Sequence, residues 1–101
     1  MALTISALRC ATQVALLGAV TENLRAVLLL SNSKNVKLLF YYHQTPSEEE
    51  KELSEIVGTE ISSDFPGSPV EVEAISLPYP NKIPEVGDKG IRVFHRYEHE
   101  Q

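Results

Sequence analysis

The chain has 101 residues, of which 43% are hydrophobic, and this is enough apolar material for one core without disulfides or a metal. We therefore expect a single domain over residues 1–101. The net charge of −5 repels nucleic-acid phosphates and anionic membranes, which excludes both as expected partners. Because the apolar runs are too short to span a bilayer and the N-terminus lacks a signal-peptide pattern, we expect a cytoplasmic protein.

The first predicted element is a helix over about residues 7–17, with Ser6 or alternatively Thr4 as its cap and Gly18 as its left-handed stop. Cys10, the only cysteine, lies among apolar neighbours and is expected to be a small buried residue rather than a reactive thiol. Helical spacing predicts an inward face that consists of Leu8, Ala11, Val14 or Ala15, and Leu17.

Two strands are predicted next, over residues 23–31 and 36–43, and the turn at 32–35 joins them as a hairpin. Both faces of the second strand carry apolar side chains, so a helix is expected to pack on the hairpin. We interpret Tyr41 and Tyr42 as packed aromatics rather than a base-stacking platform, because the following residues are heavily acidic. Alternation places Val36, Leu38, Phe40 and Tyr42 on one face.

Residues 45–65 predict the most clearly marked element, a long acidic helix. Ser47 and Glu50 have the spacing of a capping box at its start. Between residues 45 and 73 there are nine acidic residues and one basic residue, so this segment carries the excess negative charge. The expected core face consists of Leu53, Ile56, Val57, Ile61 and Phe65. The expected outer face and its flanks consist of Glu48, Glu49, Glu52, Glu55, Thr59, Ser62 and Ser63.

The C-terminal third predicts two further strands. Residues 70–77 form the first, with a bulge or a twist near Ala74, because Ile75 and Leu77 take the opposite phase to Val70 and Val72. The three prolines of residues 77–84 predict an extended connector, and residues 91–98 predict the last strand. The expected fold is α+β, in the order α-β-β-α-β-β, with a mainly antiparallel four-stranded sheet and packed helices.

No reaction centre is evident in the sequence. His95 and His99 would share a face only on a helix and they fall in a predicted strand, so no metal site is expected. The chain has no nucleophile elbow and no glycine-rich phosphate loop, and we expect neither an enzyme nor a cofactor. Glu71 and Glu73, with Glu48 or Asp64 nearby, would support a carboxylate-dependent enzyme as an alternative, although a solvated strand face is the favoured interpretation.

Two other features suggest binding. Tyr79 lies between two prolines, and such a rigid loop presents an aromatic ring as interface anchors do, although the ring would equally well fold back onto the sheet. A strand face containing Leu29, Leu39 and Tyr41 would support a self-associating structural or regulatory subunit, with a homodimer as its expected form.

Four segments carry a family resemblance that spans most of the chain. They are NLRAV at 23–27, LLFYYHQTPSEEEKELSEIVGTEISSDFP at 38–66, LPYPNKIP at 77–84 and IRVFHRYE at 91–98. Together they resemble the small bacterial immunity proteins of contact-dependent growth inhibition and related polymorphic-toxin systems. The resemblance implies a cytosolic protein that binds the C-terminal domain of one secreted toxin, often a nuclease, and blocks it.

The acidic helix is compatible with that role for a physical reason. A nuclease needs a basic cleft to hold phosphates, and carboxylates on a rigid helix can take their place. We therefore predict that the toxin is basic and that Tyr79 and the outer helix face bind it, and we keep a merely solvated helix face as the alternative. The helical residues of this predicted site are Glu48, Glu49, Glu52 and Glu55.

Overall fold

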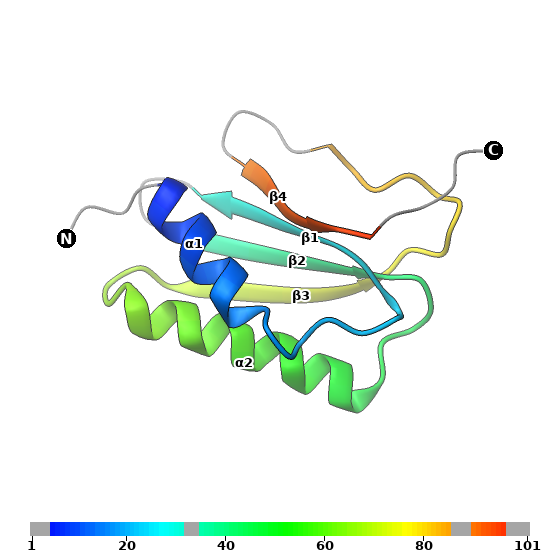
Figure 1. The fold of residues 1–101 in the computed structure, drawn as a ribbon, viewed down its shortest axis with the longest axis horizontal. Helices are drawn as coiled ribbons and strands as arrows, with labels where there is room; N and C mark the ends of the chain where they lie inside the picture. Colours follow the sequence, from blue (N-terminus) through cyan, green and yellow to red (C-terminus); the bar gives the residue numbers. More distant parts are fainter. Residues whose placement is uncertain (1–4, 32–34, 86–89, 97–101) are drawn as a thin grey trace.

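The computed structural model describes residues 5–31, 35–85 and 90–96 of the chain. Over these residues the elements follow the predicted α-β-β-α-β-β order (Figure 1). They are α1 (Ile5–Ala15), β1 (Leu24–Ser31), β2 (Val36–Tyr42), α2 (Glu48–Asp64), β3 (Val70–Ser76) and β4 (Gly90–His95).

The four strands form one mixed sheet in the order β3-β2-β1-β4. β1 pairs antiparallel with both β2 and β4, whereas β2 and β3 are parallel. The expectation of a mainly antiparallel sheet therefore needs correction at β3. The reason is α2, which carries the chain back along the sheet after β2, so that β3 starts at the same end as β2.

Both helices lie on the same face of the sheet, so the fold has two layers (Figure 1). The core lies between these layers, and the residues of β2 predicted to share one face all contribute to it. Phe40 and Tyr42 are buried there with nearly parallel rings 6.5 Å apart, which confirms Tyr42 as a packed aromatic. The largest fully buried members of this core are Leu8, Leu24, Leu29, Leu38, Phe40, Tyr42 and Ile61.

The opposite face of the sheet has a smaller apolar cluster, formed by Ala26, Leu28, Tyr41 and Ile83. Ile83 belongs to the connector after β3, so this connector covers part of the face. Leu29 packs on the helix side instead, so the predicted face of Leu29, Leu39 and Tyr41 does not exist as one surface. The pairing of β1 explains this, since Leu29 lies opposite Leu38 and Leu28 lies opposite Leu39.

The apolar cluster on the face away from the helices also explains why the apolar residues of β3 switch from one face of the strand to the other. β3 pairs with β2 in continuous register from Val70 to Ser76, so the predicted bulge near Ala74 is wrong. Val70 and Val72 pack against the helix-side core, whereas Ile75 and Leu77 pack against the cluster on the other face. A strand whose two faces both find apolar partners shows mixed periodicity without a bulge.

α1 begins and ends earlier than predicted. Ser6 lies inside the helix and is not its cap, while the alternative cap, Thr4, lies outside the described residues. Gly18 has a φ of +85°, as expected of a left-handed stop. The inward face is only partly as predicted, because Leu17 is 80% exposed. The separate prediction that Cys10 is buried is wrong, because Cys10 is exposed. The helix ends before Leu17, and Leu16 turns inward in its place.

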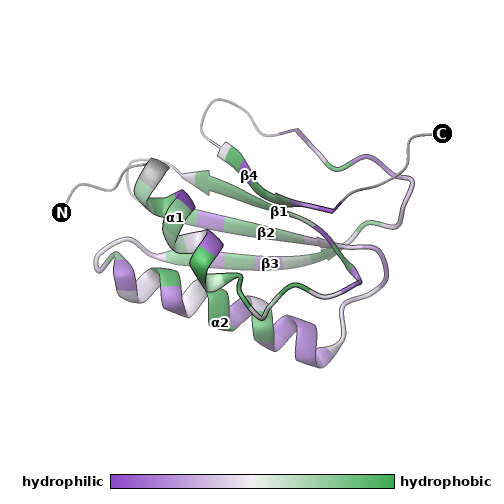
Figure 2. Ribbon diagram, in the orientation of Figure 1, coloured by the Kyte–Doolittle hydropathy of each residue, from purple (hydrophilic) through white to green (hydrophobic). Residues whose placement is uncertain are grey.

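α2 matches its predicted start and end, but one residue of its predicted core face is wrong. Val57 and Ile61 are buried and Leu53 packs against the core, whereas Ile56 is 50% exposed. Successive helical residues are rotated by about 100°, and Ile56 therefore lies on the side away from Val57 and Ile61. Hydrophilic and hydrophobic residues accordingly alternate along α2 in Figure 2.

β4 is shorter than the predicted strand, and of the predicted positions Tyr97, Glu98 and His99 lie outside the described residues. Within the described ranges, neither helix is long and apolar enough to cross a membrane.

Candidate functional site

The first turn of α2 is fixed by the side chain of Glu50. Ser47 Oγ accepts a hydrogen bond from the Glu50 backbone N–H at 3.1 Å, and Glu50 Oε1 accepts one from the Ser47 N–H at 2.9 Å. This confirms the predicted capping box. Glu50 also accepts hydrogen bonds from Thr21 Oγ1 at 2.5 Å and from Asn23 Nδ2 at 3.1 Å. The carboxylate thus ties the loop before β1 to the start of α2.

These contacts give Glu50 a structural role. Burial alone would raise the pKa of the Glu50 carboxyl, but hydrogen bonds from Thr21, Ser47 and Asn23 outweigh that effect and hold the pKa below its ordinary value. Beside it, burial and the neighbouring Glu50 charge raise the pKa of Tyr42 to about 12. The Tyr42 hydroxyl donates to the Glu50 carbonyl oxygen at 3.4 Å. Glu50 is therefore unavailable to a partner.

The other glutamates of the first half of α2 face solvent. Among the described residues, the only ion pair on this face joins Lys51 Nζ to Glu48 Oε1 at 3.5 Å, and both side chains are largely exposed. α2 holds seven acidic residues and one lysine, so its outer surface carries a strong local negative charge. The four glutamates predicted to bind a partner are indeed brought together here: Glu48, Glu49, Glu52 and Glu55.

Ile56 lies within this acidic face. It follows Glu52 by four residues and precedes Glu60 by four, so one acidic side chain lies a helical turn away on each side. The helical spacing predicts Ile56 in the core, whereas in the structure its side chain is half exposed. We refer below to Glu48, Glu49, Glu52, Glu55 and Ile56 as the outer face of α2.

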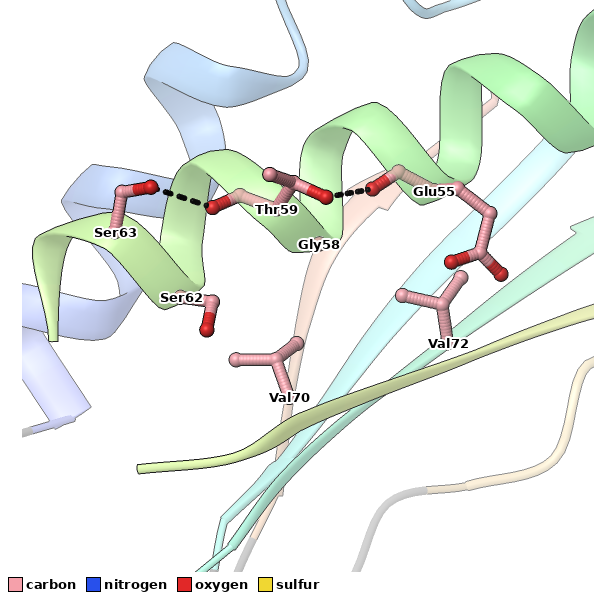
Figure 3. A pocket seen from close by; sticks show the side chains of 7 residues that line it. All are labelled: Glu55, Gly58, Thr59, Ser62, Ser63, Val70 and Val72. Carbon is pink, nitrogen blue, oxygen red and sulfur yellow. Dashed lines mark hydrogen bonds between the residues drawn. The ribbon is translucent and has the colours of Figure 1, made fainter. Parts of the chain in front are cut away.

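A groove with a volume of about 270 Å³ runs beside this face, between α2 and the edge strand β3 (Figure 3). Gly58 lies in its lining, where α2 and β3 come closest. A Cβ atom built at Gly58 would lie 2.5 Å from Val72 Cγ2, so any side chain at this position would force Val72 to shift. Seven residues line the groove: Glu55, Gly58, Thr59, Ser62, Ser63, Val70 and Val72.

The polar rim of the groove presents hydrogen-bond acceptors. The Thr59 hydroxyl donates to the Glu55 carbonyl oxygen at 3.0 Å, and the Ser63 hydroxyl donates to the Thr59 carbonyl oxygen at 3.0 Å. Their protons are thereby used within the helix, which leaves oxygen lone pairs for a ligand. In Figure 3, Glu55 and Ser62 point from α2 toward Val72 and Val70 of β3.

The groove was not among the features predicted from the sequence. The signal was present in Gly58, because a glycine inside an otherwise well-formed helix usually has a packing or functional reason. The parallel pairing that places β3 beside β2 under α2 was not predicted, however, and without it Val70 and Val72 had no assigned neighbour.

Tyr79, the other residue predicted to bind a partner, belongs to the connector after β3. Its ring is half-buried, with the Arg25 guanidinium 5.7 Å from the ring centroid, and its backbone N–H donates to His43 Nδ1 at 2.8 Å. Arg25 is itself buried and donates to the Leu77 carbonyl oxygen at 2.6 Å. The connector is thus fastened against the sheet around Tyr79, so this residue does not join the outer face of α2.

The carboxylates of the enzyme alternative do not converge. Glu71 and Glu73 are exposed, and strand alternation turns them to the sheet face opposite the one that Val70 and Val72 share with α2. Glu73 pairs there with Lys37 at 3.1 Å. Glu48 and Asp64 stand at the two ends of α2, on the other side of the sheet. Within residues 5–31, 35–85 and 90–96, no cluster of three His, Cys, Asp or Glu side chains is arranged to hold a metal ion.

The comparison with known families agrees with the resemblance seen in the sequence. The chain matches the model of the MafI2 immunity protein family over residues 5–98, a range that contains every helix and strand of the described residues. None of the curated proteins matches it. Because the match covers most of the chain, the protein belongs to the MafI2 immunity protein family and has the toxin-neutralising role of an immunity protein.

Proposed function

We propose that this immunity protein neutralises its toxin in the cytosol by docking the outer face of α2 on a basic surface of the toxin's C-terminal domain. The observation that carries the proposal is the group of exposed carboxylates on a rigid helix, where Lys51 is the single basic residue of α2. The capping box and the Glu50 hydrogen bonds hold the helix in place without using these carboxylates.

Electrostatics supports a basic partner. A local excess of one charge attracts the opposite charge over roughly 10 Å at moderate salt and speeds up encounter. Ile56 supplies what charge alone does not, because an exposed apolar side chain inside a charged rim is a typical centre for a protein interface. The outer face thus combines long-range attraction with a short-range apolar contact.

A nuclease is the toxin class that fits best. Its substrate-binding cleft must be basic to hold phosphates, and the spaced carboxylates of α2 present negative charge in a comparable row. Docking there would block nucleic acid from entering the cleft. An acidic protein of this kind needs no catalytic group, metal or cofactor to act.

The test compares two triple charge reversals that change the net charge equally. In the first, Glu49, Glu52 and Glu55 become lysine; Glu48 is kept because it pairs with Lys51. In the control, the exposed residues Glu22, Glu71 and Glu85 become lysine. The partner is the toxin domain encoded beside this gene, and circular dichroism verifies folding.

We expect the α2 variant to associate on the order of tenfold more slowly or worse at low salt, because like charges replace attraction. It should also fail to protect cells that express the toxin. The control should keep most of its association rate. Equal losses in both variants would show that only net charge matters, and an unchanged rate in the α2 variant would show that its outer face is merely solvated.

A further inference from the structure

We propose that the groove between α2 and β3 receives one long cationic side chain, an arginine or a lysine, from the toxin domain. This inference rests on the proposed function and adds a specific short-range contact to it. The occupant's aliphatic stem lies along Val70 and Val72, and its charged end reaches the Glu55 carboxylate.

The shape of the groove suits a narrow, extended side chain. Glu55 precedes Gly58 by three residues and Ser62 follows it by four, so all three lie on the side of α2 that faces β3. Gly58 contributes no side chain between the other two, and Val72 bounds the groove at this point of closest approach (Figure 3). A volume of about 270 Å³ accommodates one long side chain with solvent around it.

The floor of the groove is formed by two apolar side chains that are only partly buried. Val70 and Val72 pack with one side against the core and are otherwise accessible from the groove. Arginine and lysine bury their methylene stems on such surfaces while their charged ends remain in a polar environment. A short or purely polar side chain would leave these two valines uncovered.

The rim selects for positive charge. Glu55 is the one charged residue among the seven that line the groove, and none of the seven is basic. Thr59 and Ser63 have already donated their hydroxyl protons to backbone carbonyls. Apart from the Ser62 hydroxyl, an anion would therefore meet acceptors and a negative charge, whereas a guanidinium or an ammonium supplies the donors that the Glu55, Thr59 and Ser63 oxygens lack.

The groove is also reached from the proposed docking surface. Glu55 belongs both to the outer face of α2 and to the groove lining, so a toxin domain that covers the outer face extends to this edge of the fold. β3 is the outermost strand on this side of the sheet and leaves the entrance open.

The first experiment uses the immunity protein alone, with n-butylguanidinium as the probe and n-butanol as the uncharged control. Amide chemical shifts of isotopically labelled protein are followed during titration. Saturable shifts centred on Gly58, Ser62 and Val72 are expected with the guanidinium probe. They should disappear in Glu55→Gln and persist in Glu49→Gln, which removes the same charge from the same helix outside the groove.

Shifts that stay linear with probe concentration, that spread over all acidic residues, or that are unaffected by Glu55→Gln would overturn the proposal. n-Butylammonium distinguishes the two cationic side chains, since a planar guanidinium and a compact ammonium differ in their fit to a single carboxylate. A response to either of the two cations that requires Glu55 supports the proposal.

The second experiment measures the complex with the toxin domain. Glu55→Gln should raise the dissociation rate on the order of tenfold, because it removes a short-range charged contact. Glu49→Gln should mainly slow association. If the complex forms and the two variants dissociate equally fast, the groove proposal is wrong while the proposed function stands. If the wild-type protein does not bind the toxin domain, the proposed function itself fails.

Discussion

The inner and outer faces of α2 contain the same kinds of residue in different roles. Glu50 and Ile61 face inward, where Glu50 accepts hydrogen bonds from three residues and Ile61 is fully buried. Glu49 and Ile56 face outward, where Ile56 is half exposed and Glu49 lies in solvent. One step along the helix separates the two glutamates, so residue type alone says little about role.

This comparison shows how one helix serves both stability and binding. The inward glutamate and isoleucine are committed to contacts within the fold, so their loss is expected to affect folding. The outward pair is largely or half exposed, and its loss is expected to affect association more than folding. Four measurements test this division.

The largest expected effect concerns the two isoleucines. Ile61→Ala should lower the free energy of unfolding by about 2–5 kcal/mol, because it leaves a cavity in the core between helix and sheet. Ile56→Ala should lower it by less than about 1 kcal/mol, since the side chain is already half exposed. Denaturant unfolding measures both. Similar losses in the two variants would contradict the orientation of α2.

The second-largest expected effect concerns the two glutamates, Glu50 and Glu49. Glu50→Ala should lower the free energy of unfolding by about 2 kcal/mol, because it removes the capping box and leaves the donors of Thr21 and Asn23 without this acceptor. Glu49→Ala should leave the unfolding midpoint unchanged. Thermal and denaturant unfolding compare the pair, and equal midpoints would show that the Glu50 hydrogen bonds contribute nothing.

Gly58 tests the closest approach of α2 to the sheet. Alanine at this position gains about 1 kcal/mol in helix propensity but overpacks against Val72 at a cost of about 1–3 kcal/mol. We therefore expect a net loss of about 1 kcal/mol. Thr59→Ala, at the exposed neighbouring position, should be neutral or slightly stabilising. A stabilised Gly58→Ala variant would mean that helix and strand can separate easily.

The smallest effect appears only in alkali and belongs to the inner face. Tyr42 has a folded-state pKa of about 12 against an ordinary value of 10.0, so ionisation favours the unfolded chain as the pH rises from 10 to 12. At pH 11 the loss should be about 1 kcal/mol. The Tyr42→Phe variant should lose this part of the pH dependence. An identical alkaline slope in both proteins would place the responsible group elsewhere.

Local signals predicted the elements of this fold well. Ser47 and Glu50 define the start of α2 through contacts within one helical turn, and Gly18 defines a turn through its own backbone. Such features depend on neighbouring residues only, so a sequence shows them directly. The acidic outer face was predictable for the same reason, because helical periodicity alone places Glu48, Glu52 and Glu55 close together.

The misassigned residues depended on distant parts of the chain. Ile56 was placed in the core because its spacing from Leu53 permits it, but the position of the sheet decides which part of the helix is covered. Leu17 was predicted to point inward, yet the chain turns before it and Leu16 is buried instead. The groove was missed because Gly58 and Val72 approach each other only in the folded protein.

The sequence by itself determined the order of the elements, the capped helix and the negative charge of its outer surface, because each arises from residues close together in the chain. The tertiary structure decided that β3 runs parallel to β2, that Glu50 bonds Thr21 and Asn23, and that a groove opens beside Gly58. These features require segments far apart in sequence to meet, and their meeting is set by packing of the whole core rather than by any local pattern.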